Sequence, residues 1–246
     1  MDKKTGIIIG VIVAAFAVLI GATMFLNREQ KADYSNYDLK EVIAANEFSG
    51  DLPEMIVGNP EAPVKIFEYA DYQCEGCAAM NPQINALLEE YDSDQVALVF
   101  RNTVMSYHQN GTAAASAAAA AAIQGYWKPF KDLLYVNQNE WYYSGANDRQ
   151  EQFEEYFQKA SDGKGDLTKF REDMNSKEVA KKVSFDGGLY DYQTEIDDVE
   201  EAWTPMFYID GELIDQYHNR EMNIVEELRN RIDAKLKDLG IEKKKS

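Results

Sequence analysis

The sequence of 246 residues is strongly acidic, and its composition narrows the classes of function. Its 43 acidic and 25 basic side chains give a formal net charge of −18. Nucleic-acid binding and close adsorption to an anionic lipid surface both depend on Lys and Arg, so this balance argues against both. Hydrophobic residues make up 45% of the chain, enough to bury one sizeable core, and we expect one main domain.

The first 26 residues contain an apolar run typical of a membrane span. Residues 7–26 carry no charge, and about twenty helical residues cross a bilayer core of roughly 30 Å. A cleaved signal peptide is the alternative, but its apolar region is usually about 7–15 residues long, and no clear A-x-A site follows this run. Because Lys3 and Lys4 precede the run, the positive-inside rule predicts a cytoplasmic N-terminus.

We therefore expect a single-pass membrane anchor in residues 1–26. The bulk of the chain would then be extracytoplasmic, at the cell surface or in a periplasm, where disulfides persist. Residues 27–54 are polar and are predicted to form a tether, in which residues 38–41 (DLKE) fit a capping box and favour at least one helical turn. The main domain is expected over residues 55–240, followed by a disordered tail over residues 241–246.

A β-α-β unit is predicted around the two cysteines. Residues 64–69 (VKIFEY) are β-branched and aromatic and follow two prolines, a pattern typical of a buried strand. Residues 78–91 favour a helix, and residues 96–100 (VALVF) favour a second strand. Cys74 and Cys77 fall in the turn between the first strand and the helix.

Two further blocks complete the predicted domain. Residues 112–124 (TAAASAAAAAAIQ) have high helix propensity and open a helical subdomain over about 110–192. Asp210-Gly211, between two short apolar segments, indicates a two-residue hairpin turn. A final amphipathic helix is predicted over residues 222–239.

The spacing of Cys74 and Cys77 indicates redox chemistry. At the start of a helix, backbone N–H groups and the helix dipole stabilise a thiolate, so Cys74 is the candidate nucleophile. Cys77 lies about one turn further on and can attack a mixed disulfide at Cys74, so it is the candidate resolving cysteine. A purely structural disulfide across so short a loop would stabilise little. Structural zinc needs four ligands, and beyond this pair the chain offers only the distant His108 and His218, so no metal site is predicted.

Three segments resemble the DsbA-like thiol oxidoreductases. They are residues 57–77 (VGNPEAPVKIFEYADYQCEGC), residues 107–141 with their alanine-rich run, and residues 204–212 (TPMFYIDGE). The resemblance covers roughly residues 55 to 240. It implies an α/β thioredoxin fold with an inserted α-helical subdomain, here preceded by one N-terminal transmembrane helix.

The resemblance also implies roles for individual residues. Cys74 and Cys77 match the redox pair, and Thr204 and Pro205 match the Thr and cis-proline that face it. In such proteins the cis-proline loop binds an extended substrate peptide through its backbone. Glu68 matches a strand carboxylate near the second cysteine. If buried, it would have a raised pKa and could accept the proton of Cys77; the alternative is a carboxylate that points to solvent.

The sequence departs from the family's pattern around the cysteines and around the cis-proline. Glu75 and Gly76 stand between the cysteines, and a carboxylate there is expected to raise the pKa of Cys74 and make the disulfide less oxidising. Trp203 precedes the Thr-Pro pair and Met206 follows it. Each is a candidate substrate contact, with packing inside the domain as the alternative.

The combined expectation is an enzyme, a thiol:disulfide oxidoreductase that uses no cofactor beyond its cysteines. It would exchange its disulfide with exported client proteins, mainly oxidising them, and a redox partner would reset the pair. Two alternatives stay open. One is exchange in the reverse direction, as a reductase or isomerase, although residues 27–50 look too short for the dimerisation module that an isomerase usually has. The other is a non-enzymatic protein that holds Cu(I) between its thiolates, although no Met- or His-rich tract accompanies them.

Overall fold

The computed structural model describes residues 31–201, 203–215, 219 and 222–244. The chain divides into two compact units, Met1–Asp33 and Tyr34–Ser246, and the second contains both cysteines. The predicted anchor in residues 1–26 lies outside the described residues. Within the described part of the chain, no helix is both long and apolar enough to cross a membrane.

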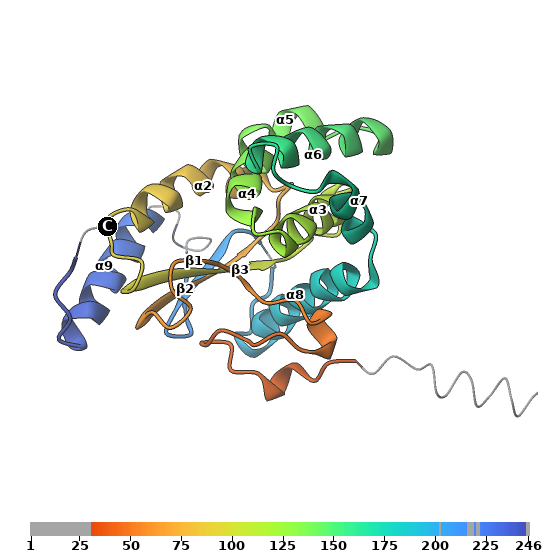
Figure 1. The fold of residues 1–246 in the computed structure, drawn as a ribbon. Helices are drawn as coiled ribbons and strands as arrows, with labels where there is room; N and C mark the ends of the chain where they lie inside the picture. Colours follow the sequence, from red (N-terminus) through yellow and green to blue (C-terminus); the bar gives the residue numbers. More distant parts are fainter. Residues whose placement is uncertain (1–30, 202, 216–218, 220–221, 245–246) are drawn as a thin grey trace, which may run out of the picture. The chain divides into compact units, whose positions relative to one another are not determined.

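A five-stranded mixed sheet forms the centre of the second unit (Figure 1). Its strand order is β1-β3-β2-β4-β5. The central pair β2 and β3 is parallel and all other neighbours are antiparallel. The strands are β1 Met55–Val57, β2 Val64–Ala70, β3 Val96–Asn102, β4 Met206–Ile209 and β5 Glu212–Ile214. The predicted strands at 64–69 and 96–100 are thus confirmed, each slightly longer than expected.

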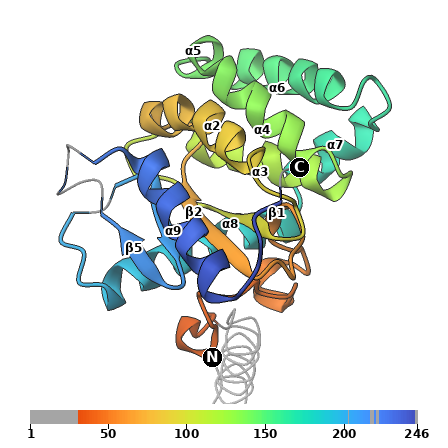
Figure 2. The same ribbon diagram turned by 90° about the vertical axis from the view of Figure 1, so that its left-hand side faces the viewer.

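Helices cover both faces of the sheet, which is why β2 and β3 are apolar almost throughout. Helices α2 (Glu75–Leu88) and α9 (Ile224–Asp238) pack on the face that presents Ile66 and Leu98 (Figure 2). Helix α8 (Lys177–Ile196) packs against β3 on the opposite face. Helix α2 begins three residues before the predicted start because Cys74 serves as its N-cap.

All the helices between β3 and β4 belong to one insertion, where the sequence predicts a helical subdomain. They are α3 Gly111–Ile123, α4 Trp127–Val136, α5 Gln138–Trp141, α6 Ala146–Ala160, α7 Leu167–Met174 and α8. Most of the alanines of α3 are buried, and α3 contacts α4, α7 and α8. Small side chains permit this close approach from several sides, so the alanine run is core packing.

The hairpin of β4 and β5 confirms the turn predicted from Asp210-Gly211. Asp210 and Gly211 have φ values of 54° and 76°, and the residues on either side, Ile209 and Glu212, are paired. Two positive φ values in succession are typical of a type I′ turn, whose twist matches that of the strands.

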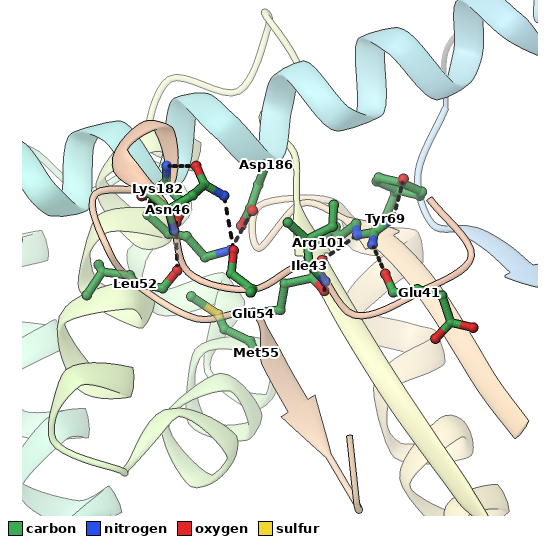
Figure 3. A network of polar contacts seen from close by, with 12 residues as sticks. Glu41, Ile43, Asn46, Leu52, Glu54, Met55, Tyr69, Arg101, Lys182 and Asp186 are labelled. Carbon is green, nitrogen blue, oxygen red and sulfur yellow. Dashed lines mark hydrogen bonds and ion pairs between the residues drawn. The ribbon is translucent and has the colours of Figure 1, made fainter. Parts of the chain in front are cut away.

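A buried arginine binds the described part of the predicted tether, residues 27–54, to the domain. Arg101 on β3 is fully buried, and its Nε donates to Glu54 Oε1 at 2.6 Å (Figure 3). Its Nη1 donates to Leu39 O and Tyr69 Oη, and its Nη2 donates to Glu41 O. The described part of this segment, from Tyr34 onward, is therefore a packed element of the domain.

The same interactions explain why residues 38–41 form a turn and not the predicted helix. Arg101 takes the carbonyl oxygens of Leu39 and Glu41 as acceptors, so they are not available to helical N–H groups. The N–H of Ile43 donates to Glu54 Oε2 at 2.7 Å, which keeps the chain extended beyond the turn. A long-range contact thus overrides the local capping signal.

The C-terminal tail also differs from the prediction, because residues 241–244 are bound to the domain. Gln95 Nε2 donates to Glu242 O at 2.7 Å, and Lys244 N donates to Gln95 Oε1 at 2.8 Å. Lys243 Nζ lies 4.1 Å from the centroid of the Tyr91 ring. These contacts attach the tail to the start of β3, so the predicted disorder is wrong for this part of the tail.

Loss of the Arg101 side chain is expected to destabilise the domain strongly. The Arg101→Met substitution leaves the buried carboxylate of Glu54 without its cation, which should reduce the free energy of unfolding by about 3–5 kcal/mol in urea titrations. Arg231→Met is the matched control. Its partners Glu212 and Glu227 are 73% and 30% exposed, so the loss should be at most about 1 kcal/mol. Equal losses in the two variants would contradict a structural role for the buried pair.

Candidate active site

The two cysteines occupy the first turn of α2 in different environments. Cys74 is half-buried and caps the helix, with its Sγ accepting a hydrogen bond from Cys77 N at 3.4 Å. Cys77 is fully buried. The Cys74 sulfur is therefore accessible to solvent and the Cys77 sulfur is not, as the roles of nucleophile and resolving cysteine require.

Hydrogen bonding lowers the pKa of the Cys74 thiol to about 6. The largest contribution is hydrogen bonding from the Cys77 side chain, and burial opposes it. The side chain of Thr204 and the backbone N–H groups of Cys77 and Gly76 add to the lowering. The pKa of Cys74 is therefore lowered overall, and Glu75 is not among its main causes. The Glu75 side chain is exposed, so water screens its charge. For Cys77, burial raises the pKa of the thiol well above its usual value.

The cis-proline loop faces the cysteine pair, as the sequence predicts. The Thr204–Pro205 peptide bond is cis, and the Cys74 thiol donates to Thr204 O at 3.3 Å. A Cβ on Gly76 would lie 3.7 Å from Pro205 Cδ, so the turn and the loop are in close approach. Trp203 is half-buried, and its carbonyl oxygen accepts a hydrogen bond from Tyr190 Oη at 2.9 Å.

The predicted substrate contacts differ in how exposed they are in the structure. Met206 is fully buried in β4, so its prediction as a substrate contact is wrong and it belongs to the core. Strand pairing opposite Tyr69 places the Met206 side chain inside the domain. Glu75 and Gly76 are exposed beside Cys74, and their contact with substrate, like that of Trp203, stays a prediction.

Glu68 on β2 is buried and close enough to Cys77 for its charge to act on it, so the alternative of a solvent-facing carboxylate is wrong. It is 2% exposed, and burial raises its pKa to about 7, partly opposed by the charge of Lys131. Its own charge contributes to the raised pKa of Cys77, which shows that the two groups are electrostatically coupled. A carboxylate with this pKa can take up the proton of Cys77 near neutral pH, which is the role predicted for it.

Lys131 on α4 is a buried cation at this site that the sequence analysis did not identify. Its side chain is 1% exposed, and its Nζ donates to Asn81 Oδ1 at 2.6 Å. The ammonium group also lies 5.8 Å and 5.6 Å from the ring centroids of Phe100 and Trp127. Because Asn81 follows Cys77 by one turn of α2, Lys131 connects the inserted helices to the cysteine helix. In the sequence it reads as an ordinary lysine of a solvent-facing helix surface.

Asp71 and His108 form a second feature that the sequence left without a function. Asp71, one residue after β2, accepts hydrogen bonds from Gln73 N and Met105 N at 2.8 Å. Its Oδ2 lies 2.7 Å from His108 Nδ1. His108 therefore helps to position its loop, and Asp71 fixes the turn that leads to Cys74. Elsewhere in the part of the chain that the structure describes, no group of three or more His, Cys, Asp or Glu residues could hold a metal ion.

A protein-family model described as Thioredoxin matches residues 51–234. The chain belongs to this thioredoxin family. Bacillus subtilis BdbD in its oxidised form is similar in structure, with a TM-score of 0.60, 20% identity, and coverage of 80% of this chain and 99% of that one. Wolbachia pipientis alpha-DsbA1 has a TM-score of 0.52 and 22% identity, covering 76% of this chain and 99% of that one. These similarities show the fold, and they agree with the predicted thioredoxin fold that carries additional helices.

Two kinds of protein are similar in sequence to the thioredoxin-family domain of this chain. The "Na(+)/H(+) antiporter NhaA 3" of Salinispora tropica is 31% identical over 155 residues, which are 63% of this chain and 21% of that protein. The "Probable disulfide bond formation protein D" of Bacillus cereus is 29% identical over 147 residues, which are 57% of this chain and 65% of that protein. The chain thus spans less than two thirds of either relative.

The pKa of Cys74 is expected to depend on Cys77 more than on Glu75. Titration of the thiolate absorbance of the reduced protein should give a midpoint near pH 6, and Cys77→Ala should raise it because the hydrogen-bond donor is lost. Glu75→Gln should leave the midpoint nearly unchanged, since Glu75 is exposed. A larger shift in Glu75→Gln than in Cys77→Ala would show that the local carboxylate dominates.

The buried carboxyl of Glu68 predicts a pH dependence of stability. Its pKa rises from 4.5 in the unfolded chain to about 7 in the folded protein. Its contribution is therefore fully present below about pH 4.5 and is lost as the pH rises through 7. Between these limits, reduced wild-type protein should lose about 3 kcal/mol more of its free energy of unfolding than Glu68→Gln, measured in urea. Parallel pH profiles would mean that Glu68 is solvated.

Proposed function

We propose that the chain is a thiol:disulfide oxidoreductase that oxidises cysteines of exported proteins through a Cys74–Cys77 disulfide. The observation that carries the proposal is the asymmetry of the pair: a half-exposed Cys74 with a pKa of about 6, and a fully buried Cys77 with a raised pKa, opposite a cis-proline. The relatives named as disulfide bond formation proteins support the same activity.

The geometry supports a two-step exchange. A client thiolate attacks Cys74 Sγ, the Cys74–Cys77 bond breaks, and Cys77 leaves as a thiolate that Glu68 can protonate. A second client thiolate then attacks the client sulfur of the mixed disulfide and releases Cys74 as a thiolate. The client gains one disulfide, and its two electrons reside on the reduced pair. A separate redox partner must then reoxidise the pair.

The stability of the Cys74 thiolate supports oxidation as the direction of exchange. A pKa of about 6 means that the reduced form is largely ionised at neutral pH and is stabilised by the hydrogen bonds that lower it. Stabilisation of the reduced form makes the disulfide a stronger oxidant. Oxidation is therefore the favoured direction, and reduction or isomerisation is second.

The location of this activity is part of the proposal and is supported by sequence alone. Residues 7–26 provide a span of suitable length, and Lys3 and Lys4 favour a cytoplasmic N-terminus. A membrane-anchored domain outside the cytoplasm would meet newly exported thiols in an oxidising compartment.

The reduction potential of the full chain tests the proposal. The protein is equilibrated with glutathione buffers, and the dithiol fraction is read after alkylation, with Cys74→Ser as the control that forms no intramolecular disulfide. We expect a value between roughly −180 and −120 mV, the range of protein oxidants. A value near or below about −270 mV would identify a reductase or an inert disulfide and would overturn the oxidase proposal.

A further inference from the structure

We propose that an aromatic ledge beside Cys74, formed by Tyr107, His108, Tyr142 and Tyr143, binds the residues that flank the reacting cysteine of a client and prefers Lys or Arg there. This inference rests on the proposed exchange activity and names its substrate class: basic segments of extended polypeptide that contain cysteine.

The four rings of the ledge form a continuous series of contacts. The centroids of Tyr107 and His108 are 4.5 Å apart, those of His108 and Tyr142 are 6.3 Å apart, and those of Tyr142 and Tyr143 are 4.5 Å apart. Tyr107 is 69% exposed and Tyr143 is 90% exposed. Large exposed aromatic groups in one place are unusual on a soluble surface and mark interaction sites.

Buried polar side chains attach the ledge to the cysteine turn. Asp71 lies 2.7 Å from the ring nitrogen of His108, and Gln73, the residue before Cys74, donates to Tyr142 O at 2.9 Å. The N–H of Asn110 donates to Gln73 Oε1 at 2.7 Å. These three polar residues are each at most 5% exposed, so they hold the His108 ring and the backbone that carries the ledge next to the cysteine turn.

Two further hydrogen-bonded groups hold the part of the ledge that follows α5. The side-chain amide of Asn110 donates to Trp141 O, Tyr142 O and Ser144 O. Gln138 on α5 donates to Cys74 O at 3.0 Å. The loop that presents Tyr142 and Tyr143 is thus fixed both to the cysteine helix and to the loop of Tyr107 and His108.

Several negative charges act on the rings of the ledge, and one cation, Arg149, lies at Asn110, to whose Oδ1 it donates. Burial raises the pKa of Tyr107 and of Tyr142, and the negative charges of the Cys74 thiolate and Asp71 raise both further. Glu75 adds to the effect at Tyr142. These influences place both phenol rings within electrostatic reach of the reacting sulfur. Each of these charges is negative, so a cation seated on the rings would be attracted by all of them.

The chain that leads to the cis-proline loop extends this negative field. Six of the eleven residues 191–201 are acidic, and no Lys or Arg occurs in residues 183–219. All six carboxyl side chains are exposed, and the segment ends two residues before Trp203. The acidic segment therefore leads along the chain to the cis-proline loop that faces Cys74.

The combination of exposed aromatic rings and negative charges favours a client segment that carries a cation. A guanidinium or ammonium group over the face of a Tyr ring is attracted by the ring quadrupole, and nearby carboxylates add a long-range attraction that accelerates encounter. An acidic client segment would meet repulsion at both surfaces. An uncharged apolar segment would gain only contact with the rings.

The test measures how fast the oxidised full chain oxidises three peptides. Each peptide contains the same Cys-Gly-Gly-Cys dithiol, flanked on both sides by Arg, by citrulline or by Glu. Citrulline has nearly the shape of Arg without its charge. Each second-order rate constant is divided by that of the same peptide with glutathione disulfide, so that differences in intrinsic thiol reactivity cancel.

We expect the normalised rate for the Arg peptide to exceed that for the citrulline peptide by about two- to five-fold, the size of one exposed cation–π contact, with the Glu peptide slowest. Tyr107→Leu removes the aromatic face but keeps apolar bulk, and it should bring the Arg-to-citrulline ratio close to one. Tyr107→Phe keeps the face and should keep the ratio. Leu239→Ala, an exposed apolar residue at the end of α9, is the control that should change nothing.

The possible outcomes separate this inference from the proposed activity. Equal, rapid oxidation of the Arg and citrulline peptides would overturn the ledge while the exchange activity stands. A ratio that persists in Tyr107→Leu but disappears in Glu75→Gln would assign the preference to charge alone and would also overturn the ledge. Oxidation of none of the peptides would overturn the exchange activity and the ledge together.

Discussion

Hydrogen bonding from Cys77 to the Cys74 sulfur is the interaction on which the chemistry of the site depends. It is the largest cause of the low pKa of Cys74, and it exists because one helical turn places Cys77 beneath its partner in the core. Burial keeps Cys77 protonated, so it can donate this bond. The same burial makes Cys77 costly to ionise when it leaves a disulfide, which explains why an acid–base group is needed nearby.

The sheet carries ionisable groups on both faces, and they have different consequences. On the face toward α2 and α4, Glu68 and Lys131 are buried near the cysteines, where their charges affect the chemistry. On the opposite face, Arg101 and Glu54 bind the chain from Tyr34 onward to β3. One set of buried charges therefore serves the reaction, and the other determines where the folded unit begins.

Local sequence patterns predicted the strands, helices and turns that depend mainly on neighbouring residues in the sequence. The alternation of strand and helix signals predicted β2, α2 and β3, and Asp210-Gly211 predicted the hairpin turn. The cis bond at Pro205 came from resemblance, because no local pattern requires it. The turn at residues 38–41, the ordered tail and the burial of Lys131 were not predictable, since each depends on partners 50 or more residues away in the sequence. Met206 was misassigned because strand register, which fixes its inward direction, is a property of the assembled sheet.

The position of Cys77 has a consequence for oxidative damage. A half-exposed thiolate such as Cys74 is readily converted by peroxide to a sulfenic acid, and in a lone cysteine further oxidation is irreversible. Here the neighbouring thiol can condense with the sulfenic acid, release water and form the Cys74–Cys77 disulfide. That product is the same disulfide through which the protein would oxidise its clients. Oxidation by peroxide would therefore re-form the disulfide and would not destroy the site.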